Sequence, residues 1–293
     1  MRFLMKRMGV YAVCFSLVLT GCVTNQGGAG TAGAGGPNVG PQLSSIFDKT
    51  GEAVVDPGKP KLDIVVPVFD PGLSENAEDY KEEGVWPELR RAEANRFAVK
   101  LKEALEDTGA FGAVRVVPDQ TATGDLYVLG KILESNGEDV EIQVEVTDIT
   151  GDNWFTRTFD HTVDPGFHKN PRNEGRDPYD PVFAEAANRI ALELEDYEVA
   201  DLETIQHVTE LRFGSNFTEE AFAEHLDATG RTVELVSFPS EADPMLRRTR
   251  AVRVRDQLFV DGLQEHYRTF SANMQDSYLV WQEQSLLELE ARS

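Results

Sequence analysis

The chain has 293 residues, of which 51 are acidic and 28 are basic, giving a formal net charge of −23. This acidity argues against nucleic acid as a partner, because phosphate binding needs a basic surface. Hydrophobic residues make up 41% of the chain, which is enough to build a core and argues against global disorder. Two cysteines are too few for a disulfide framework, and no Cys/His cluster indicates zinc, so neither metal nor cofactor is expected.

The amino terminus has the pattern of a secretory signal peptide. Residues 1–7 carry three basic residues and no acid, and residues 9–19 are almost wholly apolar. This apolar run is shorter than the about 20 residues that a transmembrane helix needs. It ends in Leu19-Thr20-Gly21-Cys22, which resembles the bacterial lipobox, where lipoprotein signal peptidase cuts before the cysteine. The resemblance implies a signal peptide over residues 1–21 and lipidation of Cys22; the alternative is an ordinary signal peptide with a chance cysteine.

The lipoprotein resemblance also implies a destination. Stable membrane anchoring needs two signals, such as two fatty chains, and palmitate together with the other fatty chains on Cys22 would supply more than two. Val23 follows this cysteine, and no aspartate stands there to retain the protein in the inner membrane. In a Gram-negative bacterium we therefore expect a lipid anchor in the cell outer membrane, with the protein facing the periplasm.

A flexible linker and then a folded body are expected after the cysteine. The linker covers residues 22–60, because residues 24–41 are uncharged and rich in Gly, Ala and Pro. Residues 62–69 are rich in β-branched side chains and predict a buried strand. After an acidic loop over 70–83, apolar residues recur at helical spacing over 86–108, with Glu93 as the one polar break. Pro87 suits the first turn of this helix, and Gly109 its end.

Four strands and a second helix are predicted next. The strands cover residues 113–117, 125–134, 140–147 and 154–163, and residues 150–153 have the composition of a hairpin turn. A polar loop over 164–181 contains Asp177 and Asp180, which we expect to cap the helix that follows and that ends near Tyr197. These elements predict an α+β fold over residues 61–197, with helices packed on a mixed sheet.

The last part of the chain, residues 198–293, is predicted to be a mostly helical carboxy-terminal module. Its helices are expected at 201–213, 218–229, 244–260 and 263–291, and residues 232–238 fit a short strand or a connector.

Several short segments resemble one periplasmic family. They are residues 64–69, the helix segment 95–105, the run 109–114, the strand 125–132 and the turn 148–151. This order resembles the TolB amino-terminal-domain-like group, which includes the curli secretion lipoprotein CsgG and the lipoprotein activator LpoB. The resemblance implies a fold for residues 62–163, up to residue 197 at most. Because members mostly act as scaffolds, binding partners or assembly factors, it implies partner binding without naming the partner.

Five arginines stand within nine residues: Arg247, Arg248, Arg250, Arg253 and Arg255. On a helix they are expected to lie opposite an apolar stripe that includes Met245 and Phe259. Guanidinium groups recognise carboxylates and phosphates through paired hydrogen bonds. Three interpretations stay open for this cluster: pairing with the protein's own acids, docking of an acidic protein partner, and contact with phospholipid or lipopolysaccharide phosphates.

The sequence shows no catalytic motif. It lacks G-x-S-x-G, a P-loop and H-E-x-x-H, and its five histidines are scattered over different segments. We therefore expect a non-enzymatic scaffold or accessory factor of an envelope complex, bound to a protein partner or to another copy of itself. Two alternatives are an auxiliary lipoprotein of a lipid or solute transporter, favoured by an apolar groove, and an unrecognised periplasmic hydrolase, favoured by a deep pocket with paired acid–base groups.

Overall fold

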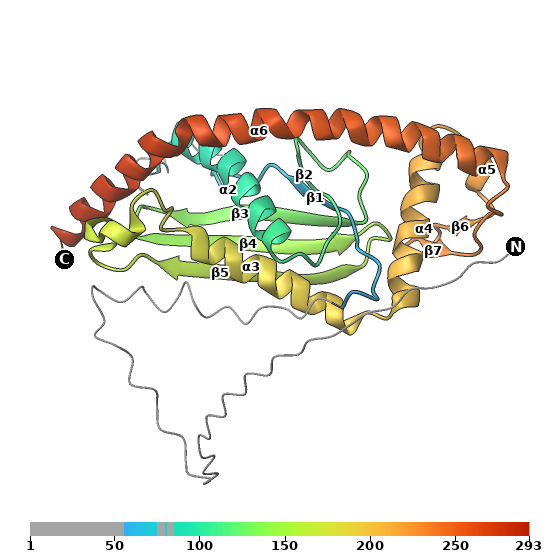
Figure 1. Cartoon of the computed structure of the whole chain (residues 1–293), viewed down its shortest axis with the longest axis horizontal. Coiled ribbons are helices and arrows are strands. Elements are labelled where there is room, and N and C mark those ends of the chain that lie inside the picture. The colour runs from blue at the N-terminus through green and yellow to red at the C-terminus, as the bar shows by residue number, and fades with distance from the viewer. Residues whose placement is uncertain (1–55, 75–79, 81–84, 293) are drawn as a thin grey trace, which may run out of the picture. The chain divides into compact units, whose positions relative to one another are not determined.

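A mixed five-stranded sheet with helices on one face forms the centre of this α+β fold (Figure 1). The structure is a computed structural model and describes residues 56–74, 80 and 85–292. The strands are β1 (Ile64–Pro67), β2 (Val114–Val117), β3 (Leu126–Ser135), β4 (Asp139–Asp148) and β5 (Asn153–Thr162). The helices on the sheet are α2 (Pro87–Asp107) and α3 (Asp180–Glu193).

The strand order β2-β1-β3-β4-β5 follows from two simple connections. Helix α2 links β1 to β2, which pair in parallel, and β1 also pairs in parallel with β3. Strands β3, β4 and β5 form an antiparallel meander, whose last turn contains Gly151 at a φ of 93°. Along β4, buried and half-buried residues alternate, because one sheet face carries helices and the other is open. The α+β class and the predicted sheet strands are confirmed.

The remaining elements lie after residue 193. They are α4 (Val199–Ser215), α5 (Glu219–Phe222), β6 (Leu226–Asp227), β7 (Glu234–Leu235) and α6 (Pro244–Glu290), with short 3-10 turns at Phe167–Lys169, Pro171–Asn173 and Leu194–Asp196. Core residues Leu202 and Val208 of α4 and Tyr278 and Leu286 of α6 belong to the same hydrophobic cluster as the sheet. The segments 61–197 and 198–293 therefore share one core.

The predicted helix over 218–229 is wrong, and so is the predicted break between the helices over 244–260 and 263–291. The helix expected over 218–229 is a single turn, α5, followed by β6, which pairs with β7. The two helices expected over 244–260 and 263–291 are one continuous helix, α6, of 47 residues. Gly262 lies within it, because an isolated glycine costs only about 1 kcal/mol in a helix interior and packing on either side of it outweighs that cost.

Helix α6 packs across α2, β2 and α4 and lies over the β2 edge of the sheet (Figure 1). The amide of Gln264 both donates to the backbone oxygen of Val116 and accepts from its N–H, each at 2.9 Å. One side chain thus satisfies both polar groups of a residue on an edge strand, which would otherwise stay open to pairing. The inner face of α6 therefore replaces a neighbouring strand.

The expected helix cap at Asp180 is wrong, whereas Asp177 accepts from the backbone N–H of Tyr179, the residue before the helix, at 3.0 Å. Helix α3 begins at Asp180 itself, and the preceding residue makes no side-chain capping bond. Asp180 instead pairs with Lys100 at 2.9 Å, and Asp177 is buried beside Arg96. Asp177 thus joins the loop before α3 to helix α2, and Asp180 joins the first residue of α3 to it; both roles depend on which cations face the carboxylates in the tertiary structure.

Candidate functional site

The lipobox residues Leu19, Thr20, Gly21 and Cys22 lie outside the described residues.

Two of the five arginines face inward and bind the protein's own acids. Arg250 donates to both carboxylate oxygens of Glu210, at 3.0–3.2 Å, and to Glu241. The bonds to Glu241 and Glu210 raise the pKa of the Arg250 guanidinium. Arg253 lies 3.9 Å from the buried Asp125, whose pKa is raised by burial. Internal pairing, the first of the three interpretations, therefore holds for Arg250 and Arg253.

The apolar stripe expected on this part of α6 is half-buried at Met245, Val252 and Leu263. Phe259, the fourth member of the stripe, is 68% exposed. The most inward row of this part of α6 combines two aliphatic and four polar residues: Leu246, Val260, Thr249, Arg253, Gln257 and Gln264. Polar residues occur on this inner side because α6 packs on polar loops and a strand edge here, where hydrogen-bonding side chains satisfy the backbone.

The other three arginines lie on the exposed side of the same helix. We call the row Arg247, Arg248, Ala251, Val254, Arg255 and Leu258 the α6 outer face; all six side chains are exposed. Within the described part of the chain, its arginines make no ion pair. Val254 and Leu258 are 55% and 65% exposed, which is high for large aliphatic side chains.

An apolar groove opens beside this face. It encloses about 340 Å³ and lies between the loop after β2, the end of α4 and α6. Phe217 and Phe259, each 68% exposed, line it together with the buried Phe213. We call it the phenylalanine groove; its other apolar lining residues are Val117, Pro118, Ala122, Val260 and Leu263. Sequence reasoning missed Phe217, since an aromatic residue just after a helix gives no periodic signal.

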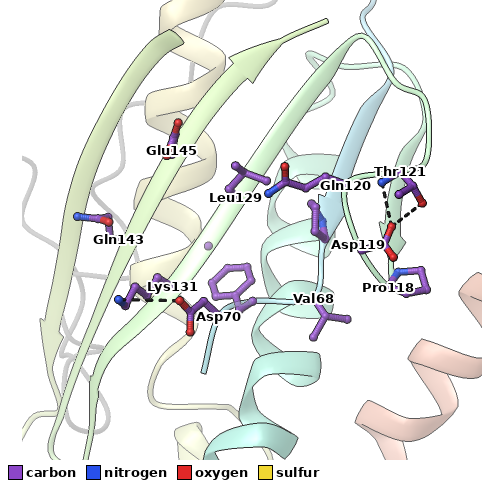
Figure 2. Close-up of a pocket in the computed structure, with 13 residues that line it drawn as sticks. Val68, Asp70, Pro118, Asp119, Gln120, Thr121, Leu129, Lys131, Gln143 and Glu145 are labelled. Atoms are coloured by element: carbon purple, nitrogen blue, oxygen red, sulfur yellow. Dashed lines mark hydrogen bonds and ion pairs between the residues drawn. The ribbon is translucent and has the colours of Figure 1, made fainter. Parts of the chain in front are cut away.

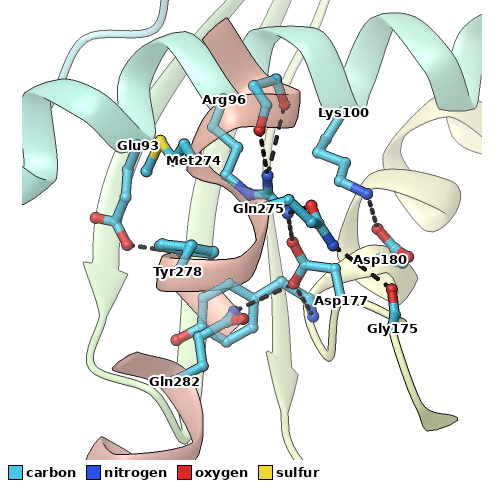
Figure 3. A network of polar contacts seen from close by, with 12 residues as sticks. Glu93, Arg96, Lys100, Gly175, Asp177, Asp180, Met274, Gln275, Tyr278 and Gln282 are labelled. Atoms are coloured by element: carbon cyan, nitrogen blue, oxygen red, sulfur yellow. Dashed lines mark hydrogen bonds and ion pairs between the residues drawn. The ribbon is translucent and has the colours of Figure 1, made fainter. Parts of the chain in front are cut away.

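A buried polar network holds α6 in position (Figure 3). The guanidinium of Arg96 on α2 donates to Asp177 at 2.5 Å and to Gln275 of α6 at 2.6 Å. It also lies 4.8 Å from the ring centre of Tyr278, a cation–π contact. Asp177 accepts a further bond from Gln282 of α6 at 3.1 Å. Removing a buried charge of this kind is costly because its partner is left uncompensated.

Glu93, the polar break in the predicted helix stripe, is the second centre of this network (Figure 3). Its carboxylate accepts from the hydroxyls of Ser135, at 2.6 Å, and Tyr278, at 2.7 Å, and pairs with Arg90 at 3.3 Å. Burial raises the pKa of Glu93, and the hydroxyl bonds and Arg90 oppose this rise. One carboxylate thus links α2, β3 and α6.

A second, more open cavity of about 680 Å³ lies at the carboxyl ends of β1 and β2 (Figure 2). Lys131 reaches Asp70 across 3.9 Å, and Asp119 accepts from the Thr121 hydroxyl, an interaction that lowers the pKa of Asp119. No histidine, cysteine or serine is among the described residues that line it. Its lining therefore offers hydrogen bonds to a ligand from Lys131, from carboxylates and from a threonine hydroxyl that is bonded to Asp119.

Comparisons with known proteins add no relative: no family model, curated protein or solved structure matches the chain. Among residues 56–74, 80 and 85–292, no group of three or more His, Cys, Asp or Glu side chains is placed to hold a metal ion. No helix in the same ranges combines the length and apolar character needed to cross a membrane.

Proposed function

We propose that this protein is an outer-membrane lipoprotein, anchored through Cys22 and facing the periplasm, that acts as a non-enzymatic scaffold or assembly factor of an envelope complex. We further propose that its α+β body is of the TolB amino-terminal-domain-like type. The lipobox pattern supports the anchor, and the helix-covered mixed sheet is compatible with that domain type.

The phenylalanine groove is the observation that carries this proposal. Large aromatic side chains at the rim of an apolar depression are typical of protein-binding sites, where they anchor the partner in a desolvated pocket. Phe217 lies in the turn after α4 and Phe259 lies on α6, and their rings remain exposed although buried apolar surface lies next to them. Leaving both rings in water costs stability, and a partner that inserts an apolar side chain between them would offset that cost.

Site-specific cross-linking in cells tests the scaffold function. A photoreactive phenylalanine analogue at position 217 or 259 should capture the same envelope protein, identified by mass spectrometry. The matched control is the analogue at Phe270, which is 43% exposed but lies on α6 outside the groove. If positions 217 and 259 capture no protein beyond those captured at 270, the groove is not a protein-docking site.

The lipid anchor has its own test. Membrane fractionation of cells producing the Cys22→Ala variant should place the mature protein in the soluble fraction. Retention of this variant in the outer membrane would show that the lipid on Cys22 is not what localises the protein.

The groove also favours a second function, that of an auxiliary lipoprotein of a lipid transporter. Its volume of about 340 Å³ falls within the range of small-ligand pockets, and apolar side chains dominate its lining. Displacement of a fluorescent fatty acid from the purified protein distinguishes the two functions. Saturable binding that Phe217→Ser abolishes would favour the transporter accessory over the protein scaffold.

A further inference from the structure

We propose that the α6 outer face binds anionic phospholipid headgroups at a bilayer surface. This surface is separate from the phenylalanine groove, and the inference does not rest on the lipid at Cys22 or on the scaffold function.

The first argument is the arrangement of the outer face. Arg247, Ala251, Val254 and Leu258 follow one another at steps of three and four residues, so they form one row along the helix. Arg248 and Arg255, seven residues apart, form a second row beside it. At about 1.5 Å per residue the first row runs for about 17 Å. Basic and apolar groups thus share the same exposed strip.

The second argument is charge. The chain carries a net charge of −23, so an anionic bilayer repels most of its surface. The outer face contains three arginines and no acid. Of the flanking acids, Asp261 accepts from Arg115 at 2.6 Å, and Asp256 lines the phenylalanine groove. Anionic headgroups are therefore attracted to this strip, whereas the acidic surface elsewhere opposes other orientations.

The third argument is the apolar content. Val254 and Leu258 are more than half exposed and lie on either side of Arg255 along the helix. On an interfacial helix, such side chains enter the boundary between headgroups and acyl chains, while arginines extend sideways to the phosphates. The outer side of a helix is convex and encloses no pocket. A convex strip suits a deformable bilayer better than a folded acidic partner, whose tight binding needs a pocket that encloses an anchoring residue.

Vesicle binding by the mature full chain carrying Cys22→Ser, which has no lipid of its own, tests the inference. It should bind vesicles of phosphatidylglycerol and phosphatidylethanolamine, lose that binding as salt increases, and not bind vesicles of phosphatidylcholine alone. The triple variant Arg247→Gln/Arg248→Gln/Arg255→Gln should partition about 100-fold more weakly, since each arginine contributes to attraction at an anionic surface.

A matched control removes the same charge elsewhere. Arg91, Arg157 and Arg231 are exposed and make no ion pair among the described residues, so Arg91→Gln/Arg157→Gln/Arg231→Gln should bind as the parent does. A fluorescent label at Leu258→Cys should shift to the blue with anionic vesicles, and the same label at Arg157→Cys should not. Equal losses in both triple variants, equal binding to phosphatidylcholine, no binding to either vesicle, or no shift at position 258 would each overturn the proposal. Binding by the outer face to a protein and not to vesicles would also overturn it.

Discussion

Substitution of Arg96 by methionine tests whether the buried network holds α6 on the body. The Arg96 and Asp177 side chains are 0% and 1% exposed, and their charged atoms lie 2.5 Å apart. Arg96→Met leaves Asp177 buried without its cation, and removing one partner of a buried pair costs about 3–5 kcal/mol. For a folded body of this size, that loss corresponds to a melting temperature lower by about 6–20 °C.

The same segment offers a matched control. Lys100 lies one helical turn after Arg96 and pairs with Asp180, but these side chains are 16% and 39% exposed. Lys100→Met should therefore cost no more than about 1 kcal/mol. The assay is equilibrium urea unfolding of the mature chain. The free energies of unfolding of the variants are compared where the slope of free energy against urea concentration is the same.

Restoring neutrality should recover part of the loss. In the double variant Arg96→Met/Asp177→Asn, the amide oxygen still accepts from Gln282 and from the backbone N–H of Tyr179, and neither substituted position carries a buried charge. We expect it to be more stable than Arg96→Met. If Arg96→Met and Lys100→Met destabilise equally, or if Asp177→Asn gives no recovery, the network is not what secures α6.

Three further changes have expected signs. Burial raises the pKa of Glu93 above 4.5, so the stability that its protonated form contributes is present below pH 4.5 and is lost as the pH rises through the folded-state pKa. The Glu93→Gln variant should therefore gain stability relative to the parent between about pH 4 and about pH 8. A difference in unfolding free energy between variant and parent that stays constant over this range would contradict the argument. Gly130→Ala should cost about 1–3 kcal/mol in thermal unfolding, because the added methyl would lie 2.3 Å from a buried phenyl ring. Gly262→Ala, where the methyl meets nothing within 4 Å, should stabilise α6 by about 1 kcal/mol. Stability changes of the same sign in both variants would refute the packing argument. Gln264→Leu should cost about 1–3 kcal/mol and speed hydrogen exchange at the Val116 amide, and unchanged exchange would show that the strand edge is protected otherwise.

The core of the fold was predictable from local patterns. The alternation along β4, the apolar helical spacing of α2 and the turn at Gly151 each depend on the residues of one segment, so the sequence alone located these elements. The end of α2 before Gly109, at a φ of 66°, is local in the same way.

The polar contacts were not predictable, because their partners are distant in the chain. Arg96 and Gln275 are 179 residues apart, and Glu93 and Tyr278 are 185 apart. Glu93 was visible in the sequence as a charged residue on an apolar helix stripe, but the sequence did not show which residue binds it. The single helix α6 was missed for a related reason: its inner face satisfies strand and loop backbone with polar side chains, so no continuous hydrophobic period marks it.

By itself, the sequence determined the acidic charge, the lipobox pattern and the succession of strands and helices along the chain. All three depend on composition or on neighbours in the chain. Only the tertiary structure decided how the arginine cluster divides. It turned Arg250 and Arg253 toward acids contributed by other segments and left Arg247, Arg248 and Arg255 exposed. The division has a geometric cause: on a helix held in one orientation by Arg96 and Glu93, each arginine's position around the axis determines whether it meets a carboxylate or solvent.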